Sequence, residues 1–166
     1  MMKPVLHAAG LAAVLAAGVA VYHASSTAAA PPSTFPLLDG TAPTTAQLEG
    51  HVTLVNFWAT SCTACLREMP QLVATYEKYR AQGYETVAVA MRTDPPAYVA
   101  QYSESRQLPF KVAMDTTGAL SRDWGGVQEP PTTFLVDRHG RIVKRYSGPP
   151  DFGELHKLIE KLLADA

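Results

Sequence analysis

The sequence predicts an α/β domain in which helices flank a mixed central sheet, preceded by an N-terminal export or anchor segment. Apolar β-branched runs alternate with amphipathic helical runs, and two later strands flank a turn, which together predict the sheet and its helices. The composition changes sharply near residue 30, which divides the chain into a targeting segment, 1–30, and a domain, 31–166. The 166 residues carry 14 Lys and Arg against 15 Asp and Glu, with 47% hydrophobic residues. This balance suits one globular domain and excludes a disordered chain.

The first 30 residues are predicted to be a signal peptide or an N-terminal membrane anchor. Lys3 and the amino terminus precede an apolar run from Ala8 to Tyr22, which is short for a membrane-spanning helix. Counted from residue 5, the run 5–22 approaches the length of a thin anchor, so membrane attachment through it is possible. Ser26-Thr27-Ala28 fits the small-residue pattern of a cleavage site. We expect a periplasmic or extracytoplasmic domain, either secreted or anchored to the inner membrane; cleavage stays open.

The elements of the domain follow from residue patterns along the chain. Residues 31–50 predict an extended lead-in with a turn at Asp39-Gly40. Residues 52–58, VTLVNFW, are β-branched or aromatic at almost every position, which predicts a strand buried on both faces. Apolar side chains at helical spacing over 66–76 predict a helix that Gly83 ends.

The second half of the domain continues the alternation and then changes pattern. We first predict a strand at 86–91, a helix that Asp94-Pro95-Pro96 starts and that runs to about Arg106, a strand at 110–114 and a short helix at 119–124. A strand at 132–136, a turn at 137–140 and a strand at 141–146 follow. The last helix begins at Asp151, with Glu154 in capping-box spacing. Right-handed crossovers make the early strands parallel, and the hairpin adds antiparallel strands. The predicted arrangement is thioredoxin-like.

The chain has two cysteines, Cys62 and Cys65, where the first predicted strand passes into a helix. Two intervening residues place the sulfurs one helical turn apart, within reach of a disulfide. Cys62 lies at the helix start, with Ser61 as a possible cap, where free N–H groups and the helix dipole stabilise a thiolate. We expect Cys62 to attack a partner disulfide and the more buried Cys65 to resolve the mixed disulfide, leaving the redox disulfide Cys62–Cys65.

Two other interpretations of the pair remain open at this point. A permanent staple would close too small a loop to stabilise the fold much. Half of a metal site would need further ligands, and none of the five histidines lies near the pair in sequence. We favour redox catalysis, which needs no separate cofactor because the dithiol carries the two electrons, and we assign no metal site. The balanced charge, without a basic run, argues against nucleic acid as a partner.

Two stretches resemble the signatures of a known family. Residues 55–70, VNFWATSCTACLREMP, are similar to the active-site stretch of the TlpA/ResA-like thiol-disulfide oxidoreductases, which are exported or membrane-anchored relatives of thioredoxin. Residues 131–137, PTTFLVD, followed by GRIV at 140–143, are similar to the second signature of that family. The resemblance covers roughly residues 35–164 and implies a thioredoxin fold.

The resemblance adds residues to the predicted site. Glu68, three residues after Cys65 on the same helical face, matches a glutamate linked to proton handling, so it joins the cysteines as a catalytic residue. The alternative for Glu68 is a solvated helix charge. Asn56 stands where classical thioredoxins have a titratable Asp, so a proton relay must use Glu68 or water.

Four residues are assigned to substrate binding. Pro131 matches the cis-proline that lies against the cysteine pair in the family, and Pro130 and Thr132 flank it. Trp58 is assigned a shielding role at the site, with a simple core position as the alternative. Pro130 is a departure from most relatives, because it lacks the backbone N–H that pairs with a substrate strand. A second departure is Ser61, which replaces the tryptophan that most relatives have before the first cysteine. Because of both departures, we expect this chain to bind its substrate less tightly than its relatives do, or with a different specificity.

The resemblance favours a reductase that acts on protein disulfide or dithiol substrates, in cytochrome c maturation or copper-centre assembly. A membrane thiol donor is the expected source of electrons. An oxidant in disulfide formation would use the same chemistry at a higher reduction potential. A Cu(I)-binding assembly chaperone, with the two cysteines as soft ligands, is the alternative from another class.

Overall fold

A computed structural model describes residues 28–165 of the chain, and the predicted signal peptide or anchor lies outside this range. Within residues 28–165, no helix is both long enough and apolar enough to cross a membrane. The described chain begins earlier than the predicted domain boundary at residue 31. Ala29 forms an antiparallel bridge with Arg141, and the Ala30 N–H donates to the Gly140 carbonyl at 2.8 Å. The Ile142 N–H also donates to the Ala28 carbonyl at 2.8 Å, so residues 28–30 lie against residues 140–142. The domain boundary at residue 31 stays a prediction.

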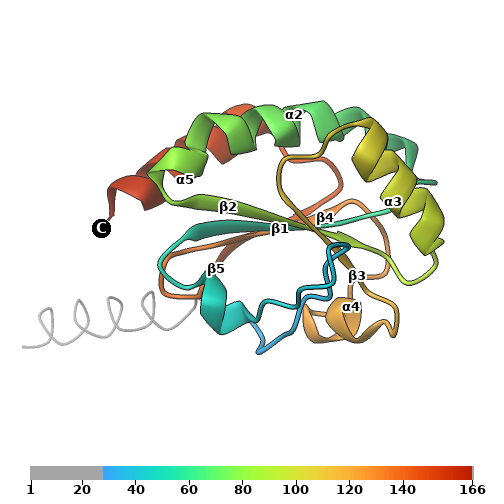
Figure 1. Ribbon diagram of the computed structural model, residues 1–166. Helices are drawn as coiled ribbons and strands as arrows, with labels where there is room; N and C mark the ends of the chain where they lie inside the picture. Colours follow the sequence, from blue (N-terminus) through green and yellow to red (C-terminus); the bar gives the residue numbers. More distant parts are fainter. Residues whose placement is uncertain (1–27, 166) are drawn as a thin grey trace, which may run out of the picture.

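Five strands form one mixed sheet in the order β3-β2-β1-β4-β5, as Figure 1 shows. The strands are β1 Val52–Trp58, β2 Tyr84–Ala90, β3 Lys111–Met114, β4 Thr132–Val136 and β5 Ile142–Ser147. β1 is parallel to β2 and β2 to β3, whereas β4 is antiparallel to both β1 and β5. β1 is thus the central strand of the sheet, and all seven of its residues are buried, as its apolar run predicts.

The helices divide between the two faces of the sheet. They are α2 Thr63–Tyr79, α3 Pro96–Ser105, α4 Ala119–Asp123 and α5 Phe152–Ala164, with short 3-10 helices η1 Thr45–Leu48 and η2 Arg80–Gln82. The crossovers from β1 to β2 and from β2 to β3 step in the same direction, so right-handed connections put α2 and α3 on one face. Figure 1 shows α5 on that face as well, and α4 with the N-terminal segment on the other.

Alternation along β1 supplies both hydrophobic cores. Val52, Leu54 and Trp58 contribute to the core under α2, α3 and α5, whereas Val55 and Phe57 contribute to the core on the opposite face. Position 56 consequently faces α2. Asn56 is therefore the one polar residue on the face of β1 that points toward α2, among apolar neighbours. A buried polar side chain in such a position needs a hydrogen-bond partner.

The predicted thioredoxin-like fold is confirmed, and strands 52–58 and 132–136 have the bounds predicted from the sequence. The lead-in differs from the prediction, because residues 45–48 form a 3-10 helix. It also packs closely on the sheet: Phe35 is fully buried, and Leu37 forms a bridge with Ala113. The turn at Asp39-Gly40 is present, with the Gly40 N–H donating to the Leu37 carbonyl at 3.1 Å.

Candidate active site

The cysteine pair lies at the start of α2, immediately beyond the carboxyl end of β1. Cys62 and Cys65 are joined in a disulfide, with 5.3 Å between their Cα atoms. Cys62 itself is the N-cap of α2, and the Cys65 N–H donates to its sulfur at 3.1 Å. Ser61, the predicted cap, does not have this role. In the reduced protein the same N–H stabilises negative charge on the Cys62 sulfur.

The two sulfurs differ in accessibility. Cys62 is half-buried, whereas Cys65 has no exposed surface because the first turn of α2 places it toward the sheet. A bulky protein disulfide can therefore approach Cys62 but not Cys65. The predicted roles of an attacking Cys62 and a resolving Cys65 stay a prediction that fits this difference in accessibility.

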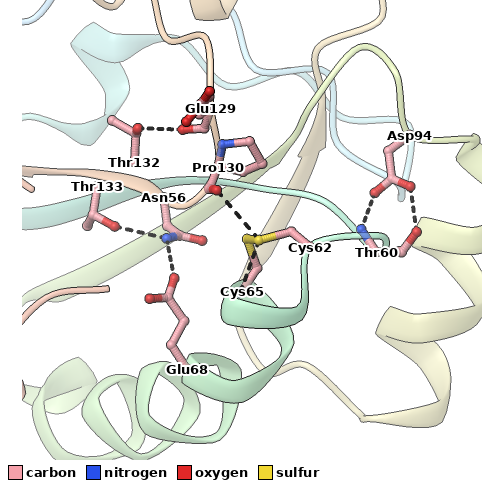
Figure 2. Close-up of a disulfide and its surroundings, with 10 residues drawn as sticks. All are labelled: Asn56, Thr60, Cys62, Cys65, Glu68, Asp94, Glu129, Pro130, Thr132 and Thr133. Atoms are coloured by element: carbon pink, nitrogen blue, oxygen red, sulfur yellow. Dashed lines mark hydrogen bonds between the residues drawn. A yellow bond between two sulfur atoms is a disulfide. The ribbon is translucent and has the colours of Figure 1, made fainter. Parts of the chain in front are cut away.

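The loop before β4 places a second element against Cys62. The Pro130–Pro131 peptide bond is cis, as the resemblance implies. The Pro130 carbonyl oxygen lies 3.6 Å from Cys62 Sγ and points toward it in Figure 2. Thr132 is buried and pairs with Phe57 in the β1–β4 register, while its Oγ1 donates to the Glu129 carbonyl at 2.8 Å. Strand pairing thus brings the proline loop to the cysteines.

A buried carboxyl lies beneath the pair. Glu68 is one turn beyond Cys65 on α2, and only 3% of its surface is exposed. Burial raises the pKa of Glu68 to about 7, although a hydrogen bond from Asn56 lowers it in part. Among the described residues, Glu68 Oε2 has no hydrogen-bond partner. Glu68 is therefore not a solvated helix charge, and its pKa suits proton exchange near neutral pH.

Asn56 is the residue that holds this carboxyl. Its Nδ2 donates to Glu68 Oε1 at 3.0 Å and to Oγ1 of Thr133, its β4 partner, at 2.9 Å (Figure 2). Sequence reasoning treats Asn56 only as a residue that does not titrate and misses this contact. The alternation of β1 was the available signal, since it directs position 56 toward α2.

A second carboxylate fixes the loop before Cys62. Asp94, 4% exposed, accepts hydrogen bonds from the Thr60 N–H at 2.6 Å and from Thr60 Oγ1 at 2.5 Å (Figure 2). The sequence places Asp94-Pro95-Pro96 at the start of α3, and the helix does begin there, with Pro95 as N-cap and no side-chain cap bond. The contact of Asp94 with Thr60 was not predicted. The loops after the parallel strands β1 and β2 meet at one sheet edge, which brings Asp94 to Thr60.

Trp58 lies in the core under α3. Its side chain is fully buried, and its ring centroid is 5.3 Å from that of Tyr102. This burial favours the core role over direct contact with a substrate.

No group of three or more His, Cys, Asp or Glu side chains in residues 28–165 is arranged to hold a metal ion.

Comparisons with known proteins show the family of the chain. A family model described as Redoxin matches residues 25–160. The thiol-disulfide oxidoreductase ResA of Halalkalibacterium halodurans is 34% identical over 117 residues, which cover 70% of this chain and 63% of that protein. The chain spans a little less than two thirds of the length of the curated relatives it matches.

Solved structures give the same result for the fold. A candidate thioredoxin from Neisseria meningitidis superposes with a TM-score of 0.78 at 37% identity, covering 84% of this chain and 93% of that one. A thiol:disulfide interchange protein of the thioredoxin family from Chlorobium tepidum superposes with a TM-score of 0.75 at 26% identity, covering 84% and 98%.

Proposed function

The chain belongs to the Redoxin family, and on that premise we propose that it is a thiol-disulfide oxidoreductase that reduces protein disulfides outside the cytoplasm. The observation that carries the proposal is the Cys62–Cys65 disulfide at the N-terminus of α2, with the Cys65 N–H on the Cys62 sulfur. A staple does not need a half-buried sulfur at a helix start, whereas an attacking thiolate does. The names of the relatives, ResA and thiol:disulfide interchange protein, support the same chemistry.

The proposed reaction passes two electrons from the dithiol to the substrate. The Cys62 thiolate attacks one sulfur of the substrate disulfide, the substrate S–S bond breaks, and one substrate thiolate leaves. A mixed disulfide through Cys62 remains. Cys65 then gives its proton to the Glu68 carboxylate and attacks Cys62 Sγ, which releases the second substrate thiolate. The enzyme ends with the Cys62–Cys65 disulfide and the substrate with two thiols.

The setting of the reaction is part of the proposal. Residues 1–30 act as a signal peptide or a membrane anchor, and the domain works in the periplasm or another extracytoplasmic space. A membrane thiol donor returns electrons to the Cys62–Cys65 disulfide. Protein disulfides in cytochrome c maturation or copper-centre assembly are the proposed substrates.

The reduction potential tests the direction of electron flow. The protein is equilibrated with glutathione or thioredoxin buffers, and the fraction of Cys62–Cys65 disulfide is read from thiol alkylation. A reductase is expected near the value of thioredoxin, about −270 mV. A value near −120 mV would overturn the reductase and support an oxidant. Failure to exchange with any disulfide, together with Cu(I) binding that both cysteine-to-serine variants lose, would support the assembly chaperone instead.

A further inference from the structure

A groove of about 640 Å³ opens beside the cysteine pair on the face of the sheet that carries α4. One wall is the loop after β2, and the other is formed by α4 and the loop that leads to the cis peptide. Its lining includes Ala59, whose carbonyl accepts the Cys62 N–H at 3.1 Å, Ser61, which precedes Cys62, and Pro130, whose carbonyl oxygen lies 3.6 Å from Cys62 Sγ. A substrate segment bound at Cys62 would therefore continue into this groove.

The charged side chains that line the groove are all positive. Two exposed arginines, Arg92 and Arg122, line it, and none of the described lining residues is an aspartate or glutamate. Arg92 packs against Gly118 on this wall, with its Cδ 3.3 Å from where a Cβ at position 118 would stand. Arg122 has one acidic neighbour, Asp123, at 3.4 Å. Both side chains of that pair are exposed to solvent, which screens their attraction, so Asp123 offsets the charge of Arg122 only in part.

The carboxylates of the adjoining loops are already engaged with the protein itself. Asp94 accepts two hydrogen bonds from Thr60, and the buried Asp115 accepts from the N–H groups of Leu120 and Ser121 and from Ser121 Oγ. Glu129 is exposed next to Pro130 but does not line the groove. These carboxylates keep their negative charge, but none of them lines the groove, so the charged side chains that a ligand contacts there are those of the two arginines.

The cis-proline loop offers less main-chain binding than an ordinary strand edge. Pro130 has no N–H to donate to an extended substrate, and its carbonyl oxygen is directed at Cys62 Sγ. Side-chain contacts must then supply more of the recognition. Rim charges of this kind act mainly on the association rate and on specificity.

We propose that the groove binds an extended segment of a substrate protein with aspartate or glutamate next to its reactive cysteine, and that Arg92 and Arg122 select that segment. The inference rests on the proposed exchange through Cys62 and specifies the substrates for it. The arginines act in recognition and take no part in the transfer of electrons.

Two synthetic peptides test the inference with the reduced protein. Each carries one cysteine bonded to thionitrobenzoate, flanked by aspartates in one peptide and by asparagines in the other. Attack of Cys62 on the peptide sulfur releases thionitrobenzoate, whose absorbance gives the second-order rate constant. At an ionic strength of about 0.01 M we expect the acidic peptide to react about fivefold faster, as two exposed ion pairs would produce. At about 1 M salt the preference should disappear.

The double variant Arg92→Gln/Arg122→Gln should lose the preference, so that its ratio of rate constants for the two peptides is close to one. Arg67→Gln is the matched control, because Arg67 is an exposed arginine near the start of α2 that does not line the groove. That variant should keep the fivefold ratio. Equal rates for the two peptides in the unsubstituted protein, or a ratio that survives in the double variant, would overturn the inference.

A neutral small disulfide, hydroxyethyl disulfide, separates this inference from the proposed function. If the unsubstituted protein fails to reduce it and both peptides, the proposed exchange itself is wrong. If it reduces all three without preferring the acidic peptide, the exchange stands and the groove assignment is wrong.

Discussion

Replacing Cys62 with serine is expected to lower the rate of disulfide exchange by at least about a thousandfold. A hydroxyl at this position cannot form the mixed disulfide that the reaction passes through. Cys65 cannot take its place, because it has no exposed surface and lies toward the sheet beneath the first turn of α2. The measurement is the rate of reduction of a protein disulfide such as insulin, with the reduced variant in excess.

The serine variant needs a check on its fold. We expect its far-ultraviolet circular dichroism and its urea unfolding midpoint to match those of the reduced unsubstituted protein, since serine is nearly the same size. Exchange that continues in a folded Cys62→Ser variant would show that Cys65 attacks, contrary to the division of roles above.

Replacing Glu68 with glutamine is expected to slow the attack of Cys65 on the mixed disulfide and to abolish the dependence of this step on the ionisation of Glu68. Ellman's reagent releases thionitrobenzoate twice, first when Cys62 attacks and then when Cys65 resolves the adduct. Because the pKa of Glu68 is raised to about 7 by burial, the second release should be half-maximal near pH 7 and level off above it. In Glu68→Gln this rise should be absent, and the second release at pH 8 should be about a hundredfold slower, as is typical of a lost general base.

Glu77→Gln is the matched control for the loss of a carboxylate from α2. Glu77 is exposed and pairs with Arg80, so its removal should leave both releases and their pH dependence unchanged. An unaltered second release in Glu68→Gln would contradict the assignment of Glu68 to proton handling.

The same carboxyl has an expected effect on stability. The pKa of Glu68 is raised to about 7 in the folded protein from its ordinary value of 4.5, so the folded state holds the proton longer than the unfolded chain. Its contribution to stability is therefore fully present below pH 4.5 and is lost as pH rises to about 7. The shift corresponds to about 3 kcal/mol. Urea unfolding of the oxidised proteins should show that Glu68→Gln loses less stability between pH 5 and pH 8 than the unsubstituted protein.

Much of the fold was predictable because local pattern and tertiary position agree. The run at 52–58 is apolar on both faces because β1 is the central strand, covered by helices on one face and by α4 and the lead-in on the other. Asp151 caps α5 as its spacing with Glu154 predicts, accepting the Glu154 N–H at 2.8 Å. The 3-10 helix at 45–48 was not predictable, since its pattern is too short to distinguish from an extended lead-in.

The cysteine pair and the cis-proline were predictable from motif and spacing. The residues that hold the site in place through hydrogen bonds were not. Asp94 and Thr60 are 34 residues apart in sequence, and the predicted helix start at Asp94-Pro95-Pro96, which is confirmed, carries no sign of a contact with Thr60. Only the pairing of β1 with β2 brings the two loops together. The contact of Asn56 with Glu68 likewise needs the register of α2 over the sheet, which sequence spacing does not give.

The central claim is that Cys62, capping α2 in a half-buried position, is the sulfur that reacts, while Cys65 stays covered beneath it. Brief alkylation of the reduced protein with one equivalent of iodoacetamide at pH 7, followed by peptide mapping, tests this claim most directly. We expect the label on Cys62 with Cys65 unmodified, because the more accessible, half-buried sulfur that accepts the Cys65 N–H holds the thiolate. Labelling of Cys65, or equal labelling of both, would contradict the account.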